Sequence, residues 1–344
     1  IGGGFGNKQD VLYEPLCAWV CTKVGGRTVK LDVTREETFI SNRVRHAEQI
    51  TITSWLRPDG TFAARKYEAY SDQGGYASHG HGIAAKGLNC FHEMYQCPNV
   101  EGDAWTVYTN KPSSGAMRGY GIPQAMWAGE SHIDDVCRQL GYDPYEFRLK
   151  NIMADGYVNA FSKNENYSDS PVQTLARGAE AIDYRALSEK YAHQDPTARI
   201  RRGVGMAAFW YNTGVWPIAL ESSACRMVVA EDGSVSLSLG ETEIGQGADT
   251  AFAQMAADAI GIPFTDVHVV STQDTDLAPF GTGAYASRQT YVAGFPIRQT
   301  ADLLRQKILA HAHELTRMPV AQLDLVDGRI VRTTDGRVLM TLGE

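Results

Sequence analysis

Alternating apolar and polar residues predict two β-hairpins, one in each half of the chain. In the first half, the apolar residues Ile50, Ile52 and Trp55 lead to a Pro-Asp-Gly turn at residues 58–60, which joins them to residues 62–70. In the second half, residues 227–230 and 235–239 flank a Glu-Asp-Gly turn. A period of two is typical of strands with one buried face, and short turns of this composition join antiparallel neighbours.

Apolar residues at helical spacing predict amphipathic helices in the first half. Residues 124–140 place Met126, Ile133, Val136 and Leu140 on one face, and Gly141 suits a C-terminal cap. A Ser-Pro pair at residues 170–171 begins a helix whose inward residues are expected to be Val172, Leu175, Ala179 and Ile182. An Asp-Pro-Tyr-Glu run at residues 143–146 resembles a capping box and begins a third helix.

Further helices are expected near the start of the chain and in its second half. Residues 10–24 are mostly apolar and predict a buried helix. Residues 248–260 predict a helix and residues 267–270 a strand. The segment 289–315 is helical in pattern, with a break at Pro296 because proline lacks the N–H that a helix interior needs. Short strands end the chain.

A change of composition divides the chain. Its 344 residues suggest about two domains. Residues 191–202 are polar, so we expect a boundary near residue 200 and domains over residues 1–199 and 200–344. No internal repeat is visible in the sequence. Helices and strands are segregated in both halves, which favours an α+β fold over a doubly wound parallel sheet.

Charge and composition exclude several kinds of partner. There are 32 Lys and Arg against 40 Asp and Glu, a net charge of −8, whereas a protein that binds the nucleic-acid backbone is basic. The sequence contains no apolar run long enough to cross a membrane. Six scattered cysteines without a C-x2-C pair fit neither zinc nor iron–sulfur spacing and suit a reducing cytoplasm. The first residue is Ile1 rather than Met, and we expect a fragment or a processed subunit.

Four glycine-containing segments are the strongest chemical signal. Loop 1 is residues 2–10 (GGGFGNKQD), loop 2 is 115–124 (GAMRGYGIPQ), loop 3 is 243–247 (EIGQG) and loop 4 is 283–289 (GAYASRQ). Glycine permits close backbone approach, and the helix expected after each loop offers unpaired N–H groups to an anion. Four such loops, each with an amide or guanidinium, suggest a large polyanionic cofactor. None has the Walker spacing or a good dinucleotide fingerprint.

Other motifs leave alternatives open. His79 and His81 lie two apart in a Ser-His-Gly-His-Gly segment, and they can line a pocket, ligate a metal or serve a structural role. The sequence has neither H-E-x-x-H nor G-x-S-x-G, which argues against a zinc protease and an α/β-hydrolase.

The four loops, in this order and spacing, resemble those of the molybdenum-binding subunit of the xanthine dehydrogenase and aldehyde oxidase family. The resemblance covers essentially the whole chain, and the Gly-Tyr-Ala-Ser segment at residues 75–78 adds to it. Residues 6–10 and 245–250 look closest to bacterial xanthine dehydrogenase subunits.

The resemblance implies a molybdopterin cofactor with molybdenum, in bacteria often as the cytosine dinucleotide, in a cleft shared by two cofactor-binding domains. The pterin holds the metal, so no protein side chain is expected to ligate it. Phe5 and Gly6 are implied to approach the metal, and Arg118 to flank metal and substrate as a catalytic residue. The implied cofactor-binding residues are Gly4, Phe5, Gly6, Ala116, Met117, Arg118, Gln246, Gly247, Ala286 and Ser287.

The implied reaction is hydroxylation of a purine such as xanthine or hypoxanthine, with water as the oxygen source and a glutamate as general base. Electrons leave through 2Fe-2S clusters and FAD on partner subunits or domains, within an oligomeric complex. The family's base glutamate lies in a Gly-Glu segment followed by proline. Glu344 follows Gly343 without a visible proline and too soon after loop 4, so it is not assigned, and this chain alone is expected to be inactive.

Three residues bear on substrate choice: Gln9, Lys86 and Tyr120. Gln9 stands where many xanthine enzymes carry glutamate, and Lys86 where many carry arginine, by its spacing from Arg118. Glutamine lacks a carboxylate and lysine lacks the planar fork, so both weaken a strict xanthine assignment. The alternatives are an aldehyde, nicotinate or aromatic-CoA oxidoreductase of the same family, or a cofactor-binding module without turnover.

Overall fold

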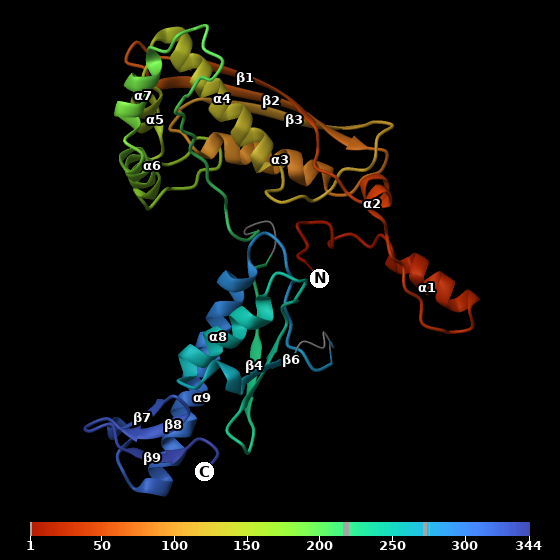
Figure 1. Ribbon diagram of the computed structural model, residues 1–344, viewed down its shortest axis with the longest axis vertical. Coiled ribbons are helices and arrows are strands. Elements are labelled where there is room, and N and C mark those ends of the chain that lie inside the picture. The colour runs from red at the N-terminus through yellow and green to blue at the C-terminus, as the bar shows by residue number, and fades with distance from the viewer. Residues whose placement is uncertain (1, 216–219, 271–273, 275) are drawn as a thin grey trace. The chain divides into compact units, whose positions relative to one another are not determined.

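The computed structural model describes residues 2–215, 220–270, 274 and 276–344. Their contacts divide the chain into two units (Figure 1). Phe5–Tyr211 forms the N-terminal unit, and Asn212–Glu344, with the glycines before Phe5, forms the C-terminal unit. The predicted domain limits at residues 199 and 200 and the shared cleft stay predictions.

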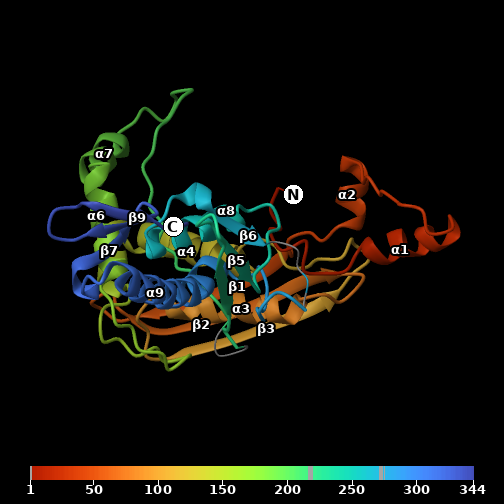
Figure 2. The ribbon, with the colours of Figure 1, turned by 90° about the horizontal axis from the view of Figure 1, so that it is seen from below.

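The N-terminal unit is built on a three-stranded sheet in the order β1-β2-β3. The predicted hairpin is confirmed: β1 (Glu48–Leu56) runs antiparallel to β2 (Phe62–Gly74). Helix α3 (Gly80–Glu93) then leads to β3 (Val100–Tyr108), which is parallel to β2. Helices α3 and α4 (Ile122–Leu140) pack on this sheet, as Figures 1 and 2 show. Burial alternates along β1 and β3, so the opposite face stays exposed.

Helix α4 confirms the amphipathic helix predicted over residues 124–140. Met126 and Ile133 are buried, Val136 packs against the core, and Gly141 caps the helix in a left-handed conformation. Leu140 was expected on the buried face, but it is exposed because it is the last residue of α4, past the core that Ile133 reaches.

Three helices follow α4, and two were predicted. In α5 (Pro144–Asn151), the Asp143 side chain accepts the N–H groups of Tyr145 and Glu146, as an N-cap should. Helix α6 (Ser170–Ala181) begins at the predicted Ser-Pro pair. It ends before Ile182, which is therefore exposed rather than inward. Helix α7 (Tyr184–Ala192) comes next.

The prediction of a buried helix over residues 10–24 is wrong. Helix α1 begins at Glu14 and ends at Lys23, and the structure buries none of these residues against the described part of the chain. Its apolar side chains are spread around the helix instead of forming one stripe, so it has no face to bury. Helix α1 and the short α2 (Arg35–Ser41) form an arm that extends from the body of the N-terminal unit (Figure 1).

The C-terminal unit confirms the second hairpin, the helix and the strand predicted after it. Strand β4 (Cys225–Val229) is antiparallel to β5 (Val235–Leu239), and β6 (Val267–Val270) is parallel to β5. Helix α8 (Ala248–Ile260) lies between β5 and β6 in the chain and packs with α9 (Gln289–Thr316) on the sheet. The core is formed by apolar residues of these elements, among them Leu237, Phe252 and Ile297.

The predicted break at Pro296 is wrong, because α9 continues through it. A proline inside a helix costs about 3 kcal/mol. On either side of Pro296, however, Ala293, Ile297 and Ala301 are fully buried, and this packing keeps the helix continuous. The apolar contacts of α9 thus outweigh its local propensity.

Short strands end the chain, as predicted. An antiparallel sheet of β7 (Leu323–Val326), β8 (Arg329–Arg332) and β9 (Val338–Thr341) packs beside α9. Two 3₁₀ turns, Phe264–Asp266 and Val320–Gln322, precede β6 and β7. The α+β class is confirmed. Among the described residues, no helix combines the length and the apolar character that crossing a bilayer requires.

Candidate functional site

The two units repeat one chain topology although the sequence shows no repeat. Each has an antiparallel strand pair, a helix, a third strand parallel to the second, and a second helix: β1-β2-α3-β3-α4 and β4-β5-α8-β6-α9. Loops 2 and 4 therefore occupy equivalent places, directly before α4 and α9. Loop 3, directly before α8, is equivalent to residues 75–79 before α3. Three of the four predicted ligand loops thus lie at equivalent junctions of the repeated topology, and residues 75–79 occupy the fourth junction.

In the N-terminal unit, loops 1 and 2 are in direct contact. The backbone N–H of Arg118 donates to the carbonyl oxygen of Phe5 at 2.8 Å. Gly6 has a φ of +106°, and a Cβ added there would lie 2.3 Å from the Ala116 carbonyl oxygen, so only glycine fits. The Arg118 guanidinium lies 5.8 Å from the Phe5 ring centroid and remains exposed. Met117 lies between Ala116 and Arg118 in this contact, and Gly4 directly precedes Phe5 in the chain.

A polar network continues from loop 2 to loop 1 through His79. The Tyr120 hydroxyl lies 2.9 Å from His79 Nδ1, and the other ring nitrogen of His79 lies 3.8 Å from an oxygen of Asp10. The second Asp10 oxygen accepts hydrogen bonds from Ser78 Oγ at 2.7 Å and Arg43 Nε at 2.9 Å. Burial alone would raise the pKa of Asp10, but the bonds from Ser78 and Arg43 outweigh it and lower that pKa. Asp10 is therefore a fixed negative charge.

The other predicted substrate residues lie elsewhere in the unit. Gln9 is exposed, and its backbone N–H closes the loop 1 turn on the Gly6 carbonyl at 3.3 Å. Lys86 is half-buried on α3, where burial lowers the pKa of its ammonium while Cys90 and Glu93 oppose this. Within the described residues, the structure joins neither side chain to Tyr120 by a hydrogen bond.

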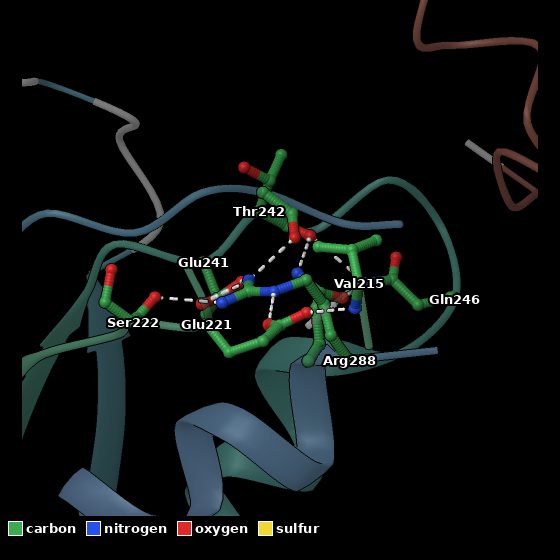
Figure 3. Close-up of polar contacts among 9 residues, drawn as sticks. Val215, Glu221, Ser222, Glu241, Thr242, Gln246 and Arg288 are labelled. Atoms are coloured by element: carbon green, nitrogen blue, oxygen red, sulfur yellow. Dashed lines mark hydrogen bonds and ion pairs between the residues drawn. The ribbon is translucent and has the colours of Figure 1, made fainter. Parts of the chain in front are cut away.

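In the C-terminal unit, loops 3 and 4 are also joined by side chains. The Gln246 amide donates to the Gln289 side-chain oxygen at the start of α9. Both amides also donate to the Thr242 carbonyl oxygen, Gln246 at 3.1 Å and Gln289 at 2.8 Å. Figure 3 shows Gln246 and Thr242 beside the base of α9. These bonds fix the predicted cofactor residue Gln246 against the next loop.

Glu243 shapes the backbone of loop 3. One of its carboxylate oxygens accepts the N–H groups of Gly245 at 2.5 Å and Gly247 at 3.2 Å, and the other accepts that of Asp249 at 3.2 Å. Burial raises the pKa of Glu243, but these backbone bonds outweigh it and lower the pKa. Loop 3 is thus wrapped around a carboxylate, a feature the sequence analysis did not foresee.

The guanidinium of loop 4 binds carboxylates and carbonyl groups of its own unit. Arg288 is fully buried, and its Nε donates to Glu221 at 2.6 Å. Its Nη1 donates to both oxygens of the buried Glu241 at 2.9 and 3.0 Å, as Figure 3 shows. It also binds the carbonyl oxygens of Ser222 and Gly283. Bidentate geometry of this kind makes Arg288 the anchor that fixes loop 4.

Backbone strain occurs in loops 1, 2 and 4. Phe5, Tyr120, Ala286 and Ser287 have positive φ angles of 54°, 49°, 51° and 55° although none is glycine. Four further non-glycine residues with a positive φ lie outside the loops: Lys163, Asp183, Arg317 and Asp327. The left-handed conformation costs an L-residue about 1–2 kcal/mol, and such strain persists where the surroundings impose it. A binding role for the loops stays a prediction.

Features of this kind fit a large anionic cofactor held mainly by backbone. Within the described residues, the N-cap residue of α9 contributes no side-chain cap, so the first N–H groups of α9 can serve a ligand. The start of α4 offers less, because the Ile122 N–H binds the Gly119 carbonyl oxygen and Pro123 has no N–H. Buried side-chain oxygens near the loops have no hydrogen-bond partner in the described part of the chain: those of Asn7, Asn212, Ser223 and Thr282. No group of three or more His, Cys, Asp or Glu in that part could hold a metal ion.

Comparison with known proteins also indicates a cofactor-binding protein. A molybdopterin cofactor-binding domain family matches residues 1–152, and a second of that description matches residues 177–344. The xanthine dehydrogenase molybdenum-binding subunit of Escherichia coli O157:H7 is 43% identical over 331 residues, which cover 96% of this chain and 44% of the relative. An Escherichia coli K12 protein named "Probable hypoxanthine oxidase XdhD" is 33% identical over 98% of this chain and 36% of its own length.

A solved structure agrees. Quinoline 2-oxidoreductase from Pseudomonas putida 86 superposes with a TM-score of 0.81 at 25% identity, over 100% of this chain and 45% of that one. The chain spans less than half the length of the curated relatives it matches. Both of its halves are molybdopterin cofactor-binding domains, and the chain belongs to the xanthine dehydrogenase and aldehyde oxidase family of molybdenum-binding subunits.

Proposed function

We propose that the complete protein is a molybdenum hydroxylase that hydroxylates a purine such as xanthine or hypoxanthine with water as the oxygen source. The observation that carries this proposal is the joining of the strained glycine loops in pairs, loop 1 with loop 2 and loop 3 with loop 4. The names of the relatives point to purines. When bound, molybdopterin supplies the metal-centred oxidation that amino-acid side chains cannot perform.

In the N-terminal unit, we assign the cofactor to the contact between loops 1 and 2. Phe5 and Gly6 present strained backbone there, and Ala116 and Met117 form the facing wall. Gly4 leads the chain into this contact. Only a glycine at position 6 lets the two backbones meet, so the site's shape depends on that residue.

In the C-terminal unit, we assign the cofactor's anionic part to loops 3 and 4. Gly247 starts α8 with open space beside it, since a Cβ there would meet nothing within 4 Å. Gln246 is held beside it by Gln289, and Ala286 and Ser287 present strained backbone before α9. The backbone N–H groups at the start of α9 suit phosphate, which agrees with the cytosine dinucleotide form of the cofactor. At α8, the Glu243 carboxylate already accepts the N–H groups of Gly247 and Asp249.

The substrate residues have separable tasks in this proposal. Arg118 has an exposed guanidinium whose fixed donors can hold a carbonyl oxygen of a purine as negative charge develops on it. Tyr120 offers an aromatic ring. Gln9 and Lys86 supply hydrogen bonds that select among heterocycles, with an amide in place of a carboxylate and an ammonium in place of a guanidinium.

Partners and setting remain part of the proposal. We infer 2Fe-2S and FAD subunits or domains as the electron acceptors, an oligomeric complex in the cytoplasm, and cofactor-binding domains over residues 1–199 and 200–344. The base glutamate is expected outside this chain, because no residue here matches its motif. Under this proposal the chain binds cofactor and substrate, and the rest of the protein completes turnover.

Two observations favour a second candidate, a molybdenum hydroxylase of the same family whose substrate is not a purine. Gln9 and Lys86 depart from the xanthine pattern, and the matched structure is named for quinoline. The test is to express the complete subunit with its partner genes and to measure molybdenum, released cytidine monophosphate and kcat/KM for four substrates: hypoxanthine, xanthine, quinoline and an aldehyde. The purines are expected to give the highest kcat/KM. Turnover of quinoline or the aldehyde with none of the purines would overturn the proposed substrate class.

A further inference from the structure

We infer that His79 is a positioning residue that fixes the Tyr120 ring for an aromatic substrate. The inference rests on the proposed function, since it assigns Tyr120 to the substrate. Its evidence is the network that joins residues 75–79, loop 2 and Asp10 of loop 1 within the N-terminal unit.

The geometry holds the His79 ring from two sides. Its Nδ1 lies 2.9 Å from the Tyr120 hydroxyl, and its Nε2 lies 3.8 Å from the Asp10 carboxylate. The two aromatic rings meet edge to face, with centroids 5.8 Å apart and planes at 81°. Asp10 is itself fixed by Ser78 and Arg43. The imidazole therefore has a defined place, and so does the phenol bonded to it.

The Tyr120 hydroxyl can act as the donor in its contact with His79. Burial, with a further contribution from Asp10, raises the pKa of this hydroxyl, so it stays protonated. When it donates to His79 Nδ1, the imidazole carries its own proton on Nε2, the nitrogen on the side of the Asp10 carboxylate.

The backbone at Tyr120 is itself fixed, since its N–H donates to the Met117 carbonyl oxygen at 2.7 Å and the next residue, Gly121, packs against the Ile83 carbonyl. What remains to be set is the direction of the phenol ring, and the contact between its hydroxyl and His79 sets it. A Cβ on Gly82, at the start of α3, would lie 3.0 Å from the Tyr120 hydroxyl, so a side chain at residue 82 would crowd the phenol.

The C-terminal unit contains the same kind of joint at the equivalent place. His79 directly precedes α3 and bonds Tyr120, which lies just before α4. Gln246 lies just before α8 and bonds Gln289, the first residue of α9. In both units, a side chain just before the first helix of the repeated topology therefore binds a side chain at the start of the second helix. His79 does for the proposed substrate loop what Gln246 does for loop 4.

The kinetic test uses the complete enzyme with its partners and the best substrate of the panel. His79→Phe keeps an aromatic ring but removes the hydrogen bond, and Tyr120→Phe removes the same bond from the other side. His79→Asn restores a polar atom near the Nδ1 position. The matched control is His81→Phe, the same change at an exposed histidine two residues along α3.

We expect His79→Phe to raise KM about 2–12-fold, the range for one hydrogen bond, with a smaller change in kcat. Asn at position 79 should recover most of the loss, and His81→Phe should resemble the unaltered enzyme. The double variant His79→Phe/Tyr120→Phe should be no worse than Tyr120→Phe alone. Multiplying losses, or a His79→Phe enzyme identical to the His81→Phe control, would overturn the inference.

A second measurement decides the inference without turnover. Tyrosine labelled with ¹³C at Cζ is incorporated into this 344-residue chain, and the Tyr120 signal is assigned by its loss in Tyr120→Phe. One sharp signal is expected, which broadens or splits in His79→Phe but not in His81→Phe. An unchanged signal in His79→Phe contradicts the inference. Absence of turnover with every substrate contradicts the proposed function instead, so the two failures are distinguishable.

Discussion

The backbone N–H of Arg118 donates to the carbonyl oxygen of Phe5, and this 2.8 Å bond joins two loops that lie far apart in the sequence. The contact is possible only because Gly6, next to Phe5, has no side chain. Its place against the Ala116 carbonyl is too close for any Cβ.

Gly6→Ala should destabilise the chain and separate the two loops. The left-handed φ alone costs an L-residue about 1–2 kcal/mol, and the contact with Ala116 adds to it. Gly26→Ala is the matched control, since Gly26 has a φ of +80° and a Cβ added there would meet nothing within 4 Å. Urea denaturation should show a clearly larger loss in Gly6→Ala. Equal losses would mean that the loop contact is not tight.

Ala286→Gly tests whether strain in loop 4 serves the cofactor. Ala286 has a φ of 51°, and glycine would relieve about 1–2 kcal/mol at an entropic cost of about 0.5–1 kcal/mol. We therefore expect a free energy of unfolding equal to or slightly above that of the unaltered chain. Lys163→Gly, at a φ of 62° outside the four loops, should behave alike.

The two variants should differ in cofactor content. Ala286→Gly loosens a loop that we assign to the cofactor, so the purified complete subunit should retain less molybdopterin. Lys163→Gly should retain as much as the unaltered protein. A stable Ala286→Gly protein with full molybdopterin content would show that the strained backbone of loop 4 is not needed to hold the cofactor.

Glu48 on β1 should make stability depend on pH. Burial raises the pKa of its carboxyl from 4.5 to about 7, although the Ser71 hydroxyl and Arg45 oppose this. The folded chain thus binds the proton more tightly than the unfolded chain does. The resulting stability is full below about pH 4.5 and is lost as the pH rises through about 7.

The measurement is urea denaturation of the unaltered chain and of Glu48→Gln, which cannot ionise, between about pH 5 and pH 8. As the pH rises, the unaltered chain should lose unfolding free energy relative to Glu48→Gln. Glu180→Gln, at an exposed residue of α6, is the control and should follow the unaltered chain. Parallel curves for Glu48→Gln and the unaltered chain would show that Glu48 titrates normally.

Local pattern explains which elements could be predicted. The hairpins, α4 and α8 follow from periodicity and turn residues, which act within a few positions. Strand β3 was missed, although Val100, Gly102 and Ala104 alternate with polar residues there. The absence of an apolar stripe on α1 is also a local signal, and it argues against burial of that helix. The continuity of α9 could not be predicted, because it depends on what packs against the helix.

The candidate site likewise has features that local sequence predicts and features that it does not. Glycine-rich motifs before helices indicated the loops, because the required backbone freedom is encoded locally. The partners of Arg288 were out of reach, since Glu221 and Glu241 meet it only through tertiary folding. The hydrogen bond between His79 and Tyr120 could not be predicted for the same reason, because only the folded unit brings the segment before α3 to loop 2.

The two arginines of loops 2 and 4 should respond to substitution in opposite ways. Arg288 is buried between Glu221 and Glu241, so Arg288→Ala removes the cation that both carboxylates bind and should cost about 3–5 kcal/mol of stability. Arg298→Ala, at an exposed residue of the same helix, should cost little. Arg118→Ala removes only an exposed side chain near the Phe5 ring, a cation–π contact of about 0.5–1 kcal/mol.

In the complete enzyme, Arg118→Ala should therefore keep its melting temperature and lose turnover, because fixed donors aimed at developing charge act on the transition state. The comparison is between kcat/KM and melting temperature, measured on Arg118→Ala, Arg118→Lys and the unaltered protein. Lysine keeps the charge but lacks the fork, so it should recover only part of the activity. A large fall in melting temperature with unchanged kinetics would make Arg118 a structural residue, as Arg288 is, and would move the catalytic assignment away from loop 2.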